Sequence, residues 1–144
     1  MPGCNDLHMK LDEQKMRQKV FQARAARVGT IDEHGRAHLV PIVFVVEQDT
    51  LYSSTDAGPR PPKRLRNLAR DPRVTVLVDD YGEDWSQVWW VRLRGAGRVV
   101  QEGAEHDRAR QLLAAKYPQF GGDPGDGAVM AVDIEEWSGW AYSE

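Results

Sequence analysis

The chain has 144 residues, the size of one compact domain, and its composition is that of a globular protein. Its net charge of −3 offers no attraction to nucleic acid, and its longest apolar run, 39–46, is interrupted by Pro41 and is too short to span a membrane. We therefore expect neither a nucleic-acid nor a membrane partner. A single cysteine, Cys4, and an N-terminus without an apolar leader predict a cytoplasmic protein without an internal disulfide.

The first half of the chain predicts one helix followed by three strands. Residues 1–10 are polar and mixed, and we expect them to form a flexible extension before a single domain over 11–144. Good helix formers predict a helix over 12–26. Strands are expected over 27–32, from the hairpin turn at 33–36 through Val46, and over 51–54. A helix followed by a strand meander favours a β-barrel over an alternating α/β fold.

The second half adds three strands and two helices. A loop over 55–62 contains three prolines, and a short helix over 63–68 follows it. Strands are expected over 73–79, 87–101 and 128–140, with a helix over 103–117. Gly95 and Gly97 inside the long strand predict a bulge or a barrel corner. The sequence therefore predicts a mainly β protein, a barrel of about six antiparallel strands with a few short helices.

No group of residues in the sequence forms a recognisable catalytic or metal-binding motif. The four histidines have no spacing that places two of them beside a carboxylate, so we predict no metal site and no catalytic side chain. Four acidic residues over 79–84 fit either a site for a hard cation or a solvated loop. His38 fits a structural or surface residue better than an acid–base group.

A basic cluster between the proline-rich loop and the next helix carries a more specific signal. The free N–H groups at a helix N-terminus favour a bound phosphate. A neighbouring Lys or Arg adds a charge-assisted hydrogen bond of about 1.5–3 kcal/mol. The pattern predicts an anion site, and the alternative is a solvated basic face. The residues of this candidate site are Arg60, Lys63, Arg64 and Arg66, with the hydroxyls of Ser53, Ser54 and Thr55 just before the loop.

Several motifs follow one another in an order shared with a known family. They are RVGT at 27–30, HLVPIVF at 38–44, KRLRNL at 63–68 and RDPRV at 70–74. In these motifs the chain resembles the pyridoxamine-phosphate-oxidase-like split-barrel superfamily, from about residue 11 to the end. The motifs EDW at 83–85, WWVR at 89–92, KYPQ at 116–119 and WSGW at 137–140 resemble its actinobacterial branch, which uses the deazaflavin coenzyme F420.

The resemblance implies an FMN-binding-type split β-barrel that forms a homodimer, with two cofactor sites at the subunit interface. The strand with Val40, Pro41 and Ile42 would run along the tricyclic ring. A Trp-bearing C-terminal strand would come from, or lie close to, the partner subunit. The residues that would hold the ribityl and phosphate groups are Ser54, Thr55, Lys63, Arg64 and Asn67. The resemblance also places Arg60, in the preceding loop, and Trp137 and Trp140, on the last strand, among the cofactor-binding residues.

These observations predict an oxidoreductase that transfers a hydride between F420 and a small organic molecule. The cofactor ring performs the chemistry, so the protein needs no nucleophile of its own. The alternatives are an FMN-dependent oxidase or reductase of the same fold, a non-catalytic deazaflavin carrier or sensor, and a haem-binding split barrel. Residues 89–94 alternate between an apolar and a basic face, and the basic face either lines the substrate pocket or lies in solvent.

Overall fold

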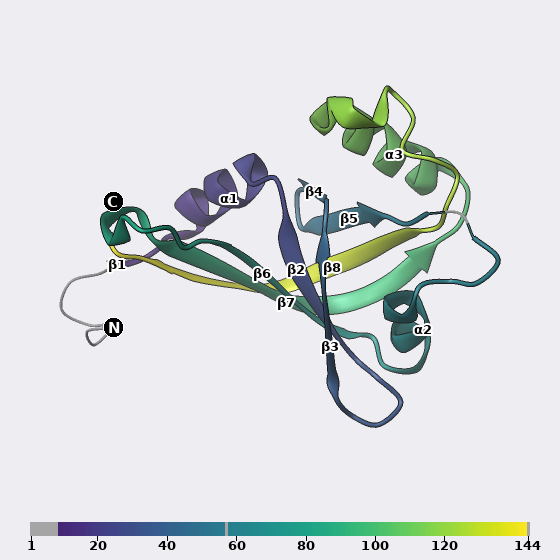
Figure 1. Cartoon of the computed structure of the whole chain (residues 1–144), viewed down its shortest axis with the longest axis horizontal. Coiled ribbons are helices and arrows are strands. Elements are labelled where there is room, and N and C mark those ends of the chain that lie inside the picture. The colour runs from purple at the N-terminus through teal and green to yellow at the C-terminus, as the bar shows by residue number, and fades with distance from the viewer. Residues whose placement is uncertain (1–8, 57, 144) are drawn as a thin grey trace.

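The computed structural model describes residues 9–56 and 58–143, which form one curled antiparallel sheet flanked by helices (Figure 1). The strands are β1 (Met9–Lys10), β2 (Ala26–Ile31), β3 (Ala37–Ile42), β4 (Val45–Glu47), β5 (Thr50–Ser54), β6 (Arg73–Asp80), β7 (Trp89–Val100) and β8 (Val129–Ala141). The helices are α1 (Glu13–Gln22), α2 (Lys63–Arg70) and α3 (Ala104–Lys116), with the short 3-10 helices η1 (Trp85–Gln87) and η2 (Pro118–Phe120).

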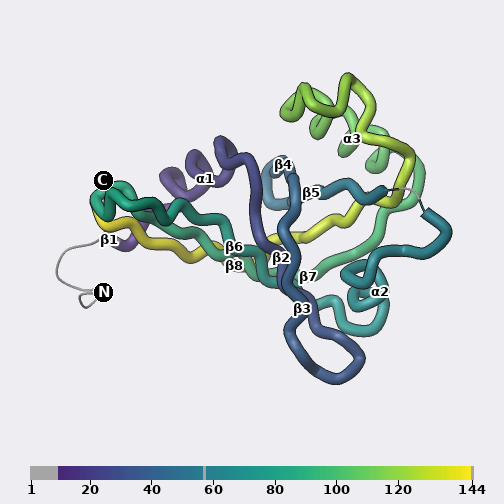
Figure 2. Tube along the Cα trace, viewed as in Figure 1, coloured from purple at the N-terminus to yellow at the C-terminus, as the bar shows by residue number. Residues whose placement is uncertain are grey.

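The strands follow the order β3-β2-β6-β7-β8-β5-β4, and β1 pairs with β8. β3 and β4 are the two ends of this path, yet they are consecutive in the chain, so the sheet must curl to bring its ends together (Figure 2). The result is a half-barrel. Seven strands on the path, plus β1, replace the six strands that we predicted for the chain, within the residues that the structure describes.

The difference in strand number has two local causes. The predicted strand through Val46 is divided at Phe44, whose N–H donates to the Tyr117 hydroxyl at 3.1 Å and whose carbonyl accepts from Lys116 Nζ at 2.9 Å. These contacts come from the far end of α3, so a short-range pattern could not predict the break. Residues 9 and 10 form β1 by pairing with β8, whereas we assigned 1–10 to an extension; residues 1–8 lie outside the described part of the chain.

Two hydrophobic clusters lie on opposite faces of the sheet. The larger one fills the concave inner face, where Val20 of α1 and Leu65 of α2 join the inward side chains of β2, β6, β7 and β8. The smaller one packs Ala109 and Leu113 of α3 against the outer face of β4, β5 and the start of β8. Alternate residues of β8 serve the two clusters, as expected for a strand buried on both sides.

The two glycines of β7 are required by close contacts. The pairing of β7 with β8 shifts register between Arg94 and Gly95, and a Cβ at Gly95 would lie 2.1 Å from the Asp133 carbonyl oxygen. A Cβ at Gly97 would lie 2.6 Å from Leu68 of α2. The predicted bulge is therefore confirmed, and the second glycine lets α2 approach the sheet.

The helix predicted over 12–26 is shorter in the structure. Asp12 caps its N-terminus by accepting from the Lys15 N–H at 2.8 Å. The helix ends at Gln22 because Ala23 is extended and Ala26 already belongs to β2. None of the described helices is long and apolar enough to cross a membrane.

Candidate cofactor site

Helix α2 begins directly after Pro62, which caps it without a side-chain hydrogen bond. Its first turn contains no acidic residue and starts with Lys63 and Arg64. Leu65 and Leu68 bury the opposite side of the helix in the inner core. The first turn therefore combines free backbone donors, the positive end of the helix dipole and two cationic side chains, which is an arrangement that favours an anion.

Arg64 is the most informative residue of this turn. Its side chain is half-buried, and its buried Nε has no hydrogen-bond partner among the described residues. Burial lowers the pKa of the guanidinium from its usual value, and the charge of Asp56 only partly offsets this effect. No carboxylate in the described chain lies within ion-pair distance of it. A half-buried cation with an unused donor is a position where a bound anion would be strongly favoured.

Lys63 and Asn67 lie on the side of α2 that faces the β2–β3 hairpin. Lys63 Nζ is 3.6 Å from a Glu33 carboxylate oxygen and 4.0 Å from one of Asp32. Asn67 is fully buried, and its amide donates to the Thr30 hydroxyl of β2 at 3.0 Å. In this structure Asn67 holds α2 against β2, whereas Lys63 is exposed enough to exchange its ion pairs for a ligand.

The hydroxyl groups before the loop differ in their availability. Thr55 is buried and donates to the Ala128 carbonyl at 2.6 Å, and Ser53 donates to the Val43 carbonyl at 2.7 Å. Both hydroxyls therefore stabilise the end of β5. Ser54 is half-buried at the last position of β5, and Arg60 is exposed in the loop.

The predicted ring-contacting strand, β3, divides its side chains between two faces. Ile42 is buried in the inner core, and Val40 is half-buried against it. Pro41 is exposed on the outer face, in register with Arg27 of β2. Among the described strands β3 pairs only with β2, so its other backbone edge is the part that could contact a flat ring.

Trp137 and Trp140 lie on opposite faces of β8. Gly139 and Trp137 share the inner face: a Cβ at Gly139 would contact Met16 of α1, and the Arg17 guanidinium lies 4.5 Å from the Trp137 ring centroid. Trp140 is nearly buried on the outer face, in register with Trp90 of β7. The structure therefore does not bring these two indoles to one surface of the same chain.

The outer face of the neighbouring strands β3, β2, β6, β7 and β8, beyond α3, forms a surface that we call the open face. Arg92 and Ser138 are cross-strand partners there, and the buried Arg92 Nε and Ser138 Oγ both lack hydrogen-bond partners among the described residues. The Arg92 guanidinium lies 5.2 Å from the Trp90 ring centroid. Leu77, in register with Arg92, is 36% exposed, and Leu39 of β3 is 69% exposed. The open face is thus partly apolar and has unused donors.

Comparison with known proteins identifies the family. The sequence profile of the pyridoxamine 5′-phosphate oxidase family matches residues 12–141. The chain belongs to this family. The comparison with curated protein sequences found no match to this chain.

Three solved structures with the same fold are 19–20% identical to this chain. A conserved hypothetical protein of Mycobacterium tuberculosis has a TM-score of 0.78 at 20% sequence identity. The alignment covers 92% of this chain and 86% of that protein's chain. An FAD-binding protein of Mesorhizobium loti has a TM-score of 0.66 at 20% sequence identity, and the alignment covers 94% of this chain and 98% of that protein's chain. An FAD-binding protein of Mycobacterium smegmatis has a TM-score of 0.60 at 19% sequence identity, and the alignment covers 92% of this chain and 96% of that protein's chain.

The structure places the predicted cofactor-binding residues in three groups. Lys63 and Arg64 share the first turn of α2, with Arg60 in the loop just before it. Thr55 and Asn67 are held by internal hydrogen bonds. The remaining predicted residues, Val40, Pro41, Ile42, Ser54, Trp137 and Trp140, are distributed over β3, β5 and the two faces of β8.

Two arrangements were missed by sequence reasoning. The pairing of Arg92 with Ser138 depends on the register of β7 and β8, which no local pattern reveals. Arg24 and Lys116 meet at the Tyr117 ring although they are far apart in the chain. The described residues contain no group of three or more His, Cys, Asp or Glu side chains able to hold a metal ion.

Proposed function

We propose that this protein is an oxidoreductase that binds the deazaflavin F420 and transfers a hydride between it and a small organic molecule. Arg64 is the observation on which this rests most. It is a half-buried cation with an unpartnered Nε at the start of α2, and a phosphate group is the ligand chemistry that this turn fits. Both F420 and FMN carry a phosphate after a ribityl chain.

The chain's residues would divide the binding of this cofactor between them. Arg64, the free N–H groups of the first turn of α2 and, after exchange of its ion pairs, Lys63 would hold the phosphate. Ser54 would contact the ribityl chain, and the free edge of β3 would lie along the ring. When bound, the deazaflavin supplies the hydride chemistry, and the protein orients it and excludes water.

The preference for F420 over FMN is supported by the surplus of cations near α2. F420 continues past its phosphate into a lactyl and oligoglutamate tail, which adds several carboxylates. Arg60 is exposed and Arg66 is half-buried close to the phosphate-binding turn. Each exposed charge contact contributes only about 0.2–1 kcal/mol, so two or three together give roughly a tenfold preference.

A flavin is the second candidate cofactor, because two proteins of the same fold are named FAD-binding. The two candidates are distinguished by fluorescence titration of the cofactor-free protein with F420 and with FMN, at low and high salt. We expect tighter binding of F420, with a preference that decreases as salt screens the tail carboxylates. Equal or tighter binding of FMN at every salt concentration would reject F420 and favour the flavin.

We further propose that the protein acts as a homodimer. The open face supports this, because it exposes Leu39 on β3 and Leu77 on β6, and Leu77 is in register with Arg92, whose Nε is unpartnered like the Ser138 Oγ. An isologous contact would cover all four residues. Such a contact would also place a tryptophan-bearing strand of one subunit near the other. Light scattering is expected to give twice the chain mass at micromolar concentration. A monomer that still binds cofactor tightly would contradict the proposal.

A further inference from the structure

Three arginine side chains of β7 point to the outer side of the sheet, and two of them are neutralised by carboxylates. They are Arg92, Arg94 and Arg98. Arg94 lies 3.6 Å from a carboxylate oxygen of Glu136, and Arg98 lies 2.6 Å from one of Glu105. Among the described residues no carboxylate lies within ion-pair distance of Arg92, whose cross-strand partners are uncharged. The sheet therefore holds one outer cation of β7 without a counter-charge.

Two unused hydrogen-bonding groups meet at this position. Arg92 lies opposite Ser138 of β8, and the Arg92 Nε and the Ser138 Oγ are both buried without a hydrogen-bond partner in the described chain. Side chains directly opposite each other in an antiparallel pair have Cβ atoms about 5 Å apart, so one oxyanion can reach both groups. Both residues are only half-buried, and rotation of the Arg92 side chain would bring these atoms to the surface. The pair thus lacks an acceptor that a ligand could supply.

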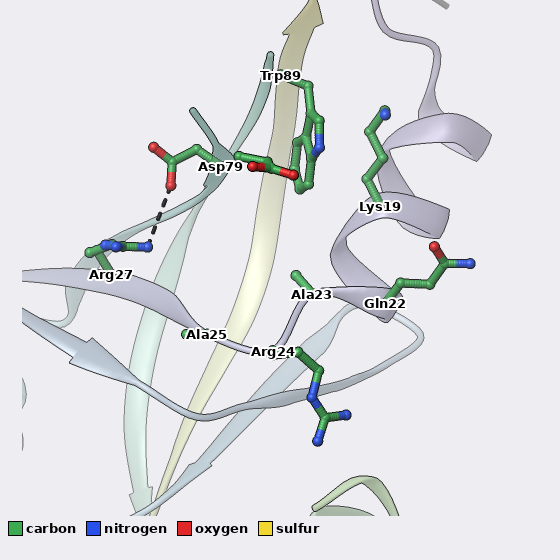
Figure 3. Close-up of a pocket in the computed structure, with 9 residues that line it drawn as sticks. Lys19, Gln22, Ala23, Arg24, Ala25, Arg27, Asp79 and Trp89 are labelled. Atoms are coloured by element: carbon green, nitrogen blue, oxygen red, sulfur yellow. Dashed lines mark hydrogen bonds and ion pairs between the residues drawn. The ribbon is translucent and has the colours of Figure 1, made fainter. Parts of the chain in front are cut away.

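The carboxylates nearest to this pair on the open face are already engaged. Asp79 of β6 forms an ion pair with Arg27 at 3.4 Å, drawn as a dashed line in Figure 3. Glu136 of β8 pairs with Arg94. Asp79 and Glu136 are diagonal neighbours of Arg92, with Cβ atoms about 7–8 Å away. Because each of these ion pairs is neutral, the local balance leaves a single positive charge at Arg92.

Apolar surface extends from Arg92 across the open face. Leu77 lies directly opposite it on β6 and is exposed, and the Arg92 guanidinium lies 5.2 Å from the Trp90 ring centroid. Further along, the exposed Leu39 of β3 leans over Gly29 of β2, where a Cβ would lie 3.0 Å from Leu39 Cδ2. Three strand spacings, roughly 14 Å along the sheet, separate Arg92 from Leu39. This surface fits a small molecule with one anionic end and an apolar body.

We propose that Arg92 and Ser138 bind the carboxylate group of a small organic acid on the open face. The planar guanidinium presents paired donors that match a carboxylate, and the hydroxyl adds a third donor. A monoanion fits the single uncompensated charge better than a phosphate dianion, because Asp79 and Glu136 lie on either side and would repel the second charge. The apolar body of the acid would lie on Leu77, toward Leu39.

This site goes beyond the proposed function and does not depend on the proposed cofactor. Helix α2, with its basic first turn, packs through Leu65 and Leu68 on the inner face of the sheet, whereas Arg92 and Ser138 are outward residues. The sheet therefore separates the two sites. In the proposed homodimer the open face would be covered, and the acid would lie between the two subunits.

A side-chain carboxylate of a second copy of the chain is the competing occupant. In that case Arg92 would stabilise the dimer and no small acid would be needed. Substitution would then change the oligomeric state rather than the binding of a free acid. The experiment must therefore measure ligand binding and molecular mass separately.

The binding test titrates the cofactor-free full chain with benzoate, with its uncharged isostere benzamide and with inorganic phosphate, at constant ionic strength. NMR signals of the Leu77 methyl groups and the Trp90 indole N–H report occupancy, because both side chains lie beside Arg92. We expect saturable shifts with benzoate, none with benzamide and weaker binding of phosphate. Non-saturating shifts with benzoate, or equal binding of benzamide, would overturn the proposal. Tighter binding of phosphate than of benzoate would overturn the assignment to a carboxylate.

Four variants make the test specific. Arg92→Gln should weaken benzoate by at least about tenfold, the loss of one charge-assisted contact, and Ser138→Ala by roughly two- to tenfold. The double variant Arg94→Gln/Glu136→Gln removes the neighbouring ion pair without changing the net charge. Arg36→Gln removes an exposed cation from the β2–β3 turn. Both controls should change affinity by less than about twofold, and a loss equal to that of Arg92→Gln in either would overturn the proposal.

Light scattering on the parent and on Arg92→Gln, with and without benzoate, tests the competing occupant. We expect the same mass in every case, because the proposed acceptor is a free acid and not a partner side chain. A dimer that dissociates in Arg92→Gln, or when benzoate is added to the parent, would identify a carboxylate of the second copy as the occupant and overturn the proposal.

Discussion

The substitution Arg64→Met tests whether the first turn of α2 is the phosphate site. Methionine keeps much of the length of the arginine side chain and removes its charge. If Arg64 donates to the cofactor phosphate, the variant loses one charge-assisted hydrogen bond of about 1.5–3 kcal/mol. The dissociation constant for F420, and for FMN, should then rise by about 10- to 150-fold.

The same substitution should leave the cofactor-free protein intact. The half-buried guanidinium has an unpartnered Nε and no ion pair in the described chain, so its removal costs no strong interaction. We expect a free energy of unfolding that is unchanged, or higher by up to about 1 kcal/mol. Reduced affinity together with unchanged stability is the combination expected of a ligand-binding residue.

Fluorescence titration and urea denaturation of the cofactor-free protein measure the two quantities. Lys63→Met is the matched comparison on the same turn, and Arg108→Gln removes an exposed charge from α3, where it pairs with Glu47. The reasoning is refuted if Arg64→Met binds both cofactors within about twofold of the parent, the range expected for an exposed charge. It is also refuted if the cofactor-free variant loses more than about 2 kcal/mol, which would indicate a structural role.

Three further predictions concern stability. Burial lowers the pKa of Lys116 to about 8 in the folded protein, so between about pH 8 and 10.5 the unfolded chain binds more protons than the folded one. The free energy of unfolding should therefore rise through that window by up to about 3 kcal/mol. Denaturation at several pH values should show this rise in the parent and not in Lys116→Met. Gly95→Ala would place its Cβ 2.1 Å from a β8 backbone oxygen and should cost at least about 2 kcal/mol by urea denaturation, whereas Gly82→Ala, in open space, should cost little. Hydrogen bonds from Arg98 lower the pKa of Glu105 to about 2, so the contribution of this carboxylate to the free energy of unfolding should be lost as pH falls from about 5 to 2. Glu105→Gln should remove about 1 kcal/mol of stability at pH 7 and should weaken this loss of stability in acid.

Local patterns in the sequence were enough for most of the elements and for the basic turn. Short strand-like segments between turns predicted β2, β5, β6, β7 and β8. In β6 and β7 the side chains also alternate, which is the periodicity of a strand whose two faces differ. Pro62 followed by a run of helix formers predicted α2 and placed Lys63 and Arg64 in its first turn. Gly95 indicated the bulge, since only glycine permits that close approach of two backbones. These features depend on residues that are near one another in the chain.

Tertiary structure decided which of the predicted groups remain available for a ligand. The hydroxyl of Thr55 and the amide of Asn67 looked like ligand contacts, but each bonds to a segment that is distant in the sequence. The division of one predicted strand into β3 and β4 depends on Tyr117, 73 residues beyond Phe44. The pairing of Arg24 with Lys116 has the same origin. Such contacts arise only when the curled sheet brings distant segments together, and no local pattern of residue types encodes them.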